Sequence, residues 1–437
     1  MNMVLFKKKS EKRNFQQIKK SGAKPLKRRE FLIFIFLGII LISSILVFTY
    51  FIYDPYESGD LPRICITCSD ELSYNEYVEC SFEIRSNQIE DQVKPMNSRI
   101  KYRGSGNEGG SRRWPKKGYR LELSQDISLL NMRKDDDWVL FSMYLDFSRT
   151  RIKLGLDSWA SLNELNPTAF SPESEYVTLY FNGEFQGLYL LAEKTDRRLF
   201  NLNEPSNDNK TSLIFQADVG STLREYHQST WHQDWPNEYE GYRVMDDIMN
   251  YIVRFINCVD NNTFFSLTNG IFSLFEKSNL IDFYLYNYFN MHLDFWSNNY
   301  FIIRNSYPNK FFLIPWDYDK SFGQYGWERY AAAKDQQKDI CNQSQLFNRL
   351  LQNSSFLKEC KDRWFYLRRS LWTQEYFIEK LEEYEERIKY ILEFEVKMWN
   401  PKTIKLKYEN DLDESTESLH DWIKERLIFC DNYFAKY

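Results

Sequence analysis

The stretch HLDFWSNNYFIIRNSYPNKFFLIPWDYDKSFG, residues 292–323, carries the most informative pattern of this 437-residue chain. Its two apolar runs, residues 300–304 and 311–316, are typical of β-strands, and the polar residues 305–309 between them are typical of a turn. The pattern therefore predicts a β-hairpin. Because such a hairpin returns the chain to its starting point, we expect polar side chains before the first strand and after the second to share one site.

Acidic and amide side chains stand at both ends of this hairpin. His292, Asp294 and Asn299 have the H-x-D-x-x-x-x-N spacing of a kinase catalytic loop, in which the Asp takes the acceptor's proton and the Asn binds magnesium. Asp317 follows the second strand, and Asp319 lies two residues further. Taken singly, each of these residues is more often structural. Together with the hairpin they predict a site for a metal ion and phosphate.

The remaining pattern divides the chain into a β-rich first half and a helical second half. Strands are predicted at residues 63–68, 77–85, 98–103, 119–123, 176–181 and 187–192, with a turn at Asn182-Gly183, a Gly-rich loop at 104–110 and a helix at 148–165. Further helices are predicted at residues 244–256, 280–291, 375–398 and 417–434. This layout predicts an α+β, protein-kinase-like two-lobed fold with a β-rich N-lobe and a helical C-lobe.

An uncharged run of 23 residues, 31–53, is long enough as a helix to cross a hydrocarbon core of about 30 Å. A cleaved signal peptide is the alternative, but its apolar region is shorter. Residues 1–30 carry eleven Lys or Arg against two Glu. The positive-inside rule then predicts a single-pass membrane protein with a cytosolic basic arm at 1–30, a transmembrane helix in the lipid bilayer at 31–53, and an extracytoplasmic or lumenal domain at 54–437.

Charge also narrows the class of partner. The basic arm has a net charge of +9 and the whole chain −5, so residues 31–437 carry −14. Nucleic acid is disfavoured as a partner because binding to its backbone depends on Lys and Arg displacing counterions.

Seven cysteines are an odd number, so an oxidising compartment leaves at least one without an intramolecular partner. Cys65 and Cys68 form a lone CxxC, and on a strand this separation points them to opposite faces, which disfavours zinc binding. If residues 64–68 and 77–84 form a hairpin, Cys65 and Cys80 would face each other across it and form a disulfide.

The block at residues 292–323 resembles the signature of the CotH kinase family, an acid and an Asn before aromatic strand residues and then an IPWDxDxSFG-like block. The resemblance continues upstream in the family's order. It includes IKYRGSGNEGGSRRWPKKGYRLEL at residues 100–123, DWVLFSMYLDFSRTR at 137–151 and VTLYFNGEFQGLYLLAEKTD at 177–196. The ordered set covers roughly residues 61–325, with weaker support at 418–431.

This resemblance implies a kinase domain over residues 54–437, with an N-lobe at about 61–196 and a C-lobe at about 197–437. It implies transfer of the γ-phosphoryl group of ATP, with Mg²⁺ or Mn²⁺, to Ser or Thr of a Ser/Thr-rich extracytoplasmic or coat-type protein. The expected roles are Asp294 as catalytic base and Asn299, Asp317 and Asp319 as metal ligands. The expected cofactor-binding residues are Lys116 or its neighbour Lys117, Arg103, Arg151 and Glu193.

Two other classes of function stay open at this point. Asp317 and Asp319 form a DxD pair, which occurs in glycosyltransferases that bind a nucleotide sugar through a metal ion. A catalytically inactive surface adhesin or assembly scaffold with the same fold is the second alternative. The presence of Asp294 and Asn299 beside Asp317 favours the enzyme.

Overall fold

The computed structural model describes residues 60–437 apart from 107–109, 207, 326–327 and 400–415. The basic arm and the apolar run at residues 31–53 lie outside this described part. Within the described part, no helix combines the length and the apolar composition that crossing a bilayer requires. The transmembrane helix included in the predicted fold class therefore has no support from the structure.

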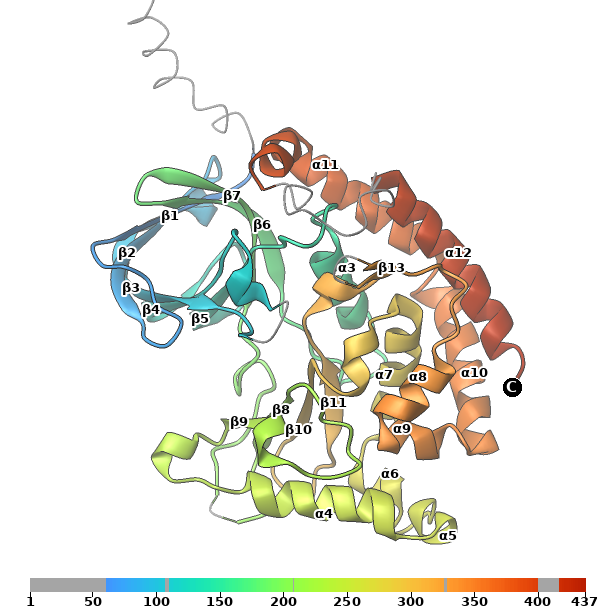
Figure 1. The fold of residues 1–437 in the computed structure, drawn as a ribbon. Helices are drawn as coiled ribbons and strands as arrows, with labels where there is room; N and C mark the ends of the chain where they lie inside the picture. The colour runs from blue at the N-terminus through green and yellow to red at the C-terminus, as the bar shows by residue number, and fades with distance from the viewer. Residues whose placement is uncertain (1–59, 107–109, 207, 326–327, 400–415) are drawn as a thin grey trace, which may run out of the picture. The chain divides into compact units, whose positions relative to one another are not determined.

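The β-rich first part of the chain closes into a barrel (Figure 1). Its strands are β1 (Arg63–Cys68), β2 (Val78–Arg85), β3 (Val93–Arg103), β4 (Gly118–Ser128), β5 (Lys134–Phe141), β6 (Ser174–Phe181) and β7 (Glu184–Glu193). Their order around the barrel is β1-β2-β3-β4-β5-β7-β6, and β6 pairs in parallel with β1. The predicted kinase-like N-lobe is wrong in this respect. Local patterns specify strands, whereas closure depends on a pairing such as Ile64 with Leu179, which no local pattern encodes.

The interior of the barrel follows from strand alternation. In β1, Ile64, Ile66 and Cys68 are buried, and the residues between them are more exposed. The β6–β7 hairpin turns at Asn182 and Gly183, which have φ values of 51° and 81°. Positive φ at both central positions is the property that favours Asn-Gly in two-residue hairpins, so the predicted turn is confirmed.

The strand register corrects the predicted disulfide. Cys68 is paired with Cys80, whereas Cys65 is opposite Glu83. All seven cysteines are free thiols. Cys65 is half-buried and Cys68 is buried, as expected for residues on opposite faces of β1. The predicted Cys65–Cys80 disulfide is wrong because its register was shifted along the partner strand.

A second sheet has four strands in the order β11-β10-β8-β9. The strands are β8 (Leu213–Ala217), β9 (Trp231–Trp235), β10 (Tyr300–Arg304) and β11 (Phe312–Pro315). The hairpin predicted from residues 300–316 is confirmed as β10 and β11, with Tyr300 opposite Pro315. A short ribbon, β12 (Gln324–Tyr325) and β13 (Glu328–Arg329), follows it.

Helix α3 (Arg151–Ala160) connects β5 to β6, and the other described helices follow β9. They are α4 (Met245–Cys258), α5 (Asn261–Phe264), α6 (Ile271–Leu274), α7 (Lys277–Asn290), α8 (Gln337–Gln343), α9 (Gln345–Leu350), α10 (Ser354–Ser370), α11 (Gln374–Met398) and α12 (Thr416–Phe434). The helices predicted in the second half correspond to α4, α7, α11 and α12. Helix α7 is buried from Asn279 to Asn290 and packs against β11 and α10. It therefore supports the second strand of the hairpin.

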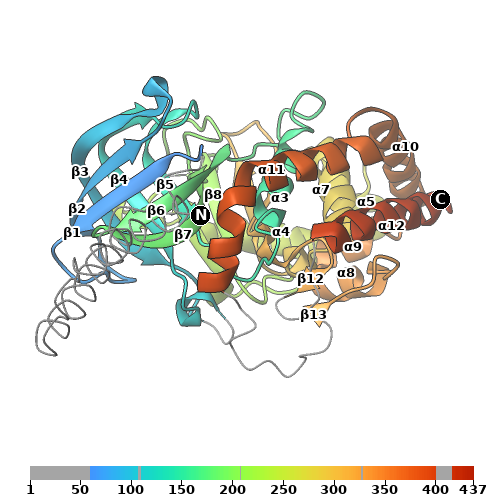
Figure 2. The ribbon, with the colours of Figure 1, turned by 90° about the horizontal axis from the view of Figure 1, so that it is seen from above.

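Helix α11 joins the helical part to the barrel. Figure 2 shows α11 beside α12 and beside β7, and it also packs on α3. Its buried residues are spaced by alternating steps of four and three: Phe377, Leu381, Tyr384, Ile388, Ile391 and Glu395. This spacing places one carboxylate, that of Glu395, on an otherwise apolar and aromatic stripe.

Candidate active site

The β10–β11 hairpin brings Asn299 and Asp317 to the same end of the sheet. The backbone N–H of Trp316 donates to the carbonyl of Asn299 at 2.8 Å, and Asp317 follows directly. Asn299 and Asp317 have φ values of 54° and 67°. Asn and Asp tolerate this left-handed conformation better than most residues, so the chain can turn sharply at both positions.

Asp319 is a buried carboxylate in the 3-10 turn η6 (Tyr318–Lys320) that follows. Burial raises the pKa of its carboxyl well above the usual range, and the charges of Asp317 and Asp294 raise it further. Its Oδ1 atom is buried without a hydrogen-bond partner. A buried carboxylate oxygen beside two other carboxylates is unfavourable unless a cation neutralises it.

These residues fit a divalent cation. Carboxylate and amide oxygens are the ligands that Mg²⁺ and Mn²⁺ prefer, and Asn299, Asp317 and Asp319 supply them from one end of the hairpin. The orphaned Oδ1 of Asp319 is the observation that supports the fit.

His292 links Asp294 to the turn at Asp317. The backbone N–H of Asp294 donates to Nδ1 of His292 at 3.1 Å, and Nε2 of His292 donates to the Asp317 carbonyl at 2.7 Å. Burial lowers the pKa of His292 to about 4, so the imidazole is neutral and can both accept and donate. Phe295 stacks on the ring at 3.7 Å between centroids. His292 therefore orients the loop that carries Asp294.

Two basic side chains approach the carboxylates of Asp294, Asp317 and Asp319. Lys320 Nζ lies 3.5 Å from Asp294 Oδ2. The Arg103 guanidinium, from the end of β3, lies 4.4 Å from the centroid of the Phe141 ring, and its charge interacts with Asp317 and Asp319. Burial lowers the pKa of Arg103. The family resemblance implies a position near the phosphates for Arg103, whereas Lys320 was not singled out.

Lys116 lies in a different cluster. Its ammonium group is buried, donates to Glu395 Oε1 at 2.6 Å and also donates to the Leu188 carbonyl. Arg149 Nε donates to the same Glu395 oxygen at 3.0 Å. The ammonium group of Lys116 therefore donates to Glu395 and Leu188 rather than to Asp294, Asp317 or Asp319.

The other expected cofactor-binding residues also have protein partners. Lys117 Nζ donates to the carbonyl of Arg112 at 2.8 Å. Arg151 Nη1 donates to Asp146 Oδ1 at 2.7 Å, at the start of α3. Glu193 accepts backbone N–H groups on both of its carboxylate oxygens at 3.0 Å, which ties together the end of β7 and the neighbouring loops. Each of these three residues therefore has at least one protein partner in this structure.

Helix α3 supports the turn that carries Asp317 and Asp319. Gly155 faces Tyr318 so closely that a Cβ at Gly155 would overlap the Tyr318 ring. Tyr286, a residue of α7, donates its hydroxyl hydrogen to the Gly155 carbonyl at 2.6 Å. The Tyr286 ring also lies 6.0 Å from the Tyr318 ring, so the turn contacts both α3 and α7.

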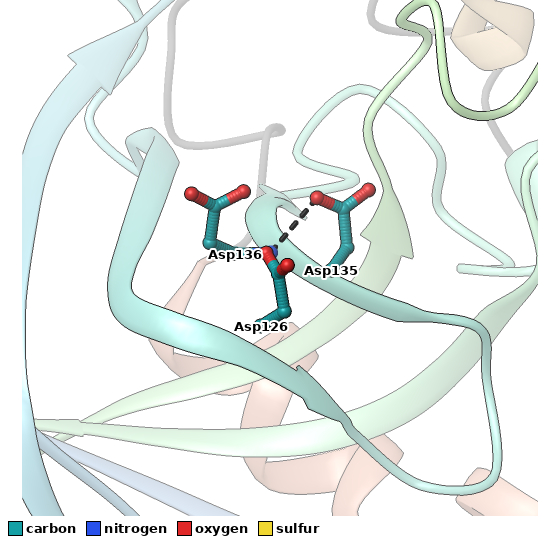
Figure 3. A group of neighbouring side chains, drawn as sticks. All are labelled: Asp126, Asp135 and Asp136. Atoms are coloured by element: carbon teal, nitrogen blue, oxygen red, sulfur yellow. Dashed lines mark hydrogen bonds between the residues drawn. The ribbon is translucent and has the colours of Figure 1, made fainter.

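A further acidic group lies at the barrel, away from the hairpin. Asp126, Asp135 and Asp136 hold ligand atoms within 4.8 Å of one another (Figure 3). Arg198 Nη1 pairs with all three carboxylates, at 3.0 Å from Asp126 and 2.6 Å from Asp136. Arg133, at 2.6 Å from Asp135, and Arg198 together offset two of the three negative charges, so the group is a structural ion-pair cluster.

The H-x-D-x-x-x-x-N spacing of His292, Asp294 and Asn299 and the carboxylates at the end of the hairpin are features of a kinase-like protein. The family model described as CotH kinase protein matches residues 100–430, so the chain belongs to the CotH kinase family. It is 26% identical over 306 residues to the inner spore coat protein H of Bacillus subtilis, with 68% of this chain and 78% of that protein covered.

Among solved structures, the chain is similar to the Helicobacter pylori proinflammatory kinase CtkA. The identity is 10% and the TM-score is 0.24, over 64% of this chain and 94% of that chain. A similarity of this size carries no argument about function.

Proposed function

We propose that this protein transfers the γ-phosphoryl group of ATP to Ser or Thr hydroxyl groups of a protein, with Mg²⁺ or Mn²⁺ as cofactor. The observation that carries the proposal is the buried Asp319 carboxylate, with an orphaned Oδ1, beside Asp317 and Asp294. Membership of the CotH kinase family supports the same reaction class.

The proposed roles follow from the positions of the side chains. Asn299, Asp317 and Asp319 would hold the metal ion, which supplies positive charge to the phosphate oxygens. Asp294 lies on the separate loop that His292 orients, so it is suited to accept the proton of the acceptor hydroxyl. The acceptor oxygen then bonds to the γ-phosphorus as the bond between that phosphorus and the bridging oxygen of ADP breaks.

The acceptor class is proposed from the relative. Because the Bacillus subtilis protein is named an inner spore coat protein, we propose a Ser/Thr-rich coat-type or other extracytoplasmic protein as the acceptor. The acidic charge of residues 31–437 favours an acceptor with basic residues near its Ser or Thr.

Nucleotide binding by the purified full-length protein tests this proposal. ATP and a UDP-sugar are titrated with and without Mn²⁺, and transfer of radiolabelled phosphate from ATP to a Ser-rich acceptor protein is measured. We expect Mn²⁺-dependent ATP binding and phosphate incorporation. Binding of the UDP-sugar in preference to ATP would indicate a glycosyltransferase, and binding of neither would indicate an inactive scaffold.

A further inference from the structure

The phosphate groups of a nucleotide at the hairpin end require fixed positive charge besides the metal ion. The family resemblance implies this role for Lys116 or Lys117. Lys116 is buried against Glu395 and the Leu188 carbonyl, and Lys117 donates to the Arg112 carbonyl. In this structure the ammonium groups of both lysines are therefore bonded to protein atoms.

Lys320 has the required position. It directly follows Asp319, and its ammonium nitrogen lies 3.5 Å from Asp294 Oδ2. Its side chain is 29% exposed, so the group reaches both solvent and the carboxylates. Charge-assisted hydrogen bonds between nitrogen and oxygen are typically about 2.7 to 2.9 Å long. At 3.5 Å the contact with Asp294 is loose, and the flexible lysine stem allows the ammonium group to turn towards another anion.

Arg103 approaches the same carboxylates from the barrel. Its charge interacts with Asp317 and Asp319, and its guanidinium rests on Phe141, whose ring lies 5.5 Å from that of Trp316, the residue before Asp317. Gly118 is paired with Arg103 across β3 and β4, where a Cβ would lie 3.0 Å from Arg103 Cγ. The two basic side chains therefore come from different elements, Arg103 from β3 and Lys320 from η6.

We propose that Lys320 binds the phosphate groups of the nucleotide together with Arg103, and that in the nucleotide-free protein Lys320 forms an ion pair with Asp294. This inference rests on the proposed function. Nucleotide binding would move the ammonium group from the Asp294 carboxylate to a phosphate oxygen.

Opposite effects of one substitution distinguish this role from a structural one. In the absence of nucleotide, the Lys320 charge opposes a cation at the carboxylates, so Lys320→Met should raise the affinity for Mn²⁺ alone. When nucleotide is present, loss of the contact between Lys320 and the phosphate should weaken Mn²⁺–ATP binding by about tenfold or more. A general loss of structure would weaken both.

The experiment measures Mn²⁺ binding by electron paramagnetic resonance and ATP binding by calorimetry in the full-length protein. Lys320→Met is compared with Lys320→Arg, which should retain most of the ATP affinity. Lys334→Met is the matched control, because Lys334 has a similar exposure, 30%, and a similarly loose contact of 3.7 Å with Asp339. We expect Lys334→Met to bind both ligands as the wild type does.

An unchanged ATP affinity in Lys320→Met, or parallel losses of Mn²⁺ and ATP affinity, would overturn the assignment of Lys320. A wild-type protein that binds no ATP would instead overturn the proposed function itself. In that case the Mn²⁺ titrations still show whether Lys320 opposes a cation at Asp294, and an unchanged Mn²⁺ affinity would remove this part of the inference too.

Discussion

Lys116 Nζ lies 2.6 Å from Glu395 Oε1, although 279 residues separate them in the chain. Arg149 Nε shares the same oxygen, and the backbone N–H of Leu188 donates to Oε2 at 2.8 Å. Gly187, with φ of 103°, leaves the room that the Glu395 carboxylate occupies. The cluster attaches α11 to the barrel and to the loop that leads into α3.

Loss of Glu395 should destabilise the fold strongly. Glu395→Leu leaves the buried charges of Lys116 and Arg149 without a carboxylate, and breaking a buried pair in this way typically costs about 3 to 5 kcal/mol. Urea unfolding measures the change. Glu385→Ala is the control on the same helix, because its partly exposed contact with His420 should contribute no more than about 1 kcal/mol. Equal stability of the two variants would refute a stabilising role for the cluster.

Removal of both charges should separate stability from nucleotide binding. In the double variant Lys116→Met, Glu395→Gln, the single carbonyl oxygen of Gln can still accept from Arg149, while its NH2 group replaces the oxygen that accepts from Leu188. We expect this variant to be more stable than Glu395→Leu and to bind Mn²⁺–ATP within about threefold of the wild type, or about 0.7 kcal/mol. Loss of ATP binding in a folded double variant would show that Lys116 contacts the phosphates.

The pH dependence of stability should report Lys116. Burial lowers its pKa to about 8 from 10.5, against the opposing effect of Glu395. Between these two values the unfolded state binds more protons than the folded state, so the contribution of Lys116 to unfolding free energy rises with pH. Below pH 8, Lys116 is protonated in both states, so its buried charge lowers the free energy of unfolding by the full amount. We expect the stability of the wild type relative to Lys116→Met to rise by about 2 kcal/mol from pH 8 to 10. A flat or falling difference in urea unfolding would contradict this.

The sequence was sufficient to predict the local elements of the site. The β10–β11 hairpin, α7 and the Asn182-Gly183 turn were predicted because each depends on a periodicity or turn preference within about twenty residues. Closure of the barrel was missed because the parallel pairing of β1 with β6 joins segments more than a hundred residues apart. Strands β8 and β9 were not predicted from the sequence.

The partner of Lys116 was missed for the same physical reason. Its basic neighbourhood suggested a phosphate contact, and its actual partner lies at the far end of the sequence. One signal was present, because Glu395 continues the stripe of buried residues that includes Ile388 and Ile391 at helical spacing. An acid on such a stripe predicts a buried basic partner, although it does not identify which one.

Close packing of α3 on the turn predicts a specific steric effect. Gly155→Ala should destabilise the protein by about 1 to 3 kcal/mol, because its Cβ would overlap the Tyr318 ring. This loss opposes the general preference of helices for Ala over Gly. Combining it with Tyr318→Ala should recover part of the loss in a double-mutant cycle measured by thermal unfolding. Additive effects of the two substitutions would contradict direct packing.

Asp317 and Asp294 are assigned different tasks, so their loss should have different consequences. Asp317→Ala should weaken Mn²⁺-dependent ATP binding as well as turnover, because a ligand of the ion that contacts the phosphates is removed. Asp294→Ala should leave ATP binding largely intact while turnover falls by about a hundredfold or more, because only the proton acceptor is lost. Asp339→Ala, in an exposed pair, is the control with wild-type behaviour.

The most direct test of the phosphotransferase is therefore a paired measurement on these variants. ATP binding in the presence of Mn²⁺ and transfer of radiolabelled phosphate to a Ser-rich acceptor are measured for the wild type, Asp317→Ala and Asp294→Ala. We predict ATP binding in the wild type and in Asp294→Ala, weakened binding in Asp317→Ala, and transfer by the wild type alone. Persistent transfer in both variants, or a wild-type protein that binds no ATP, would contradict the account.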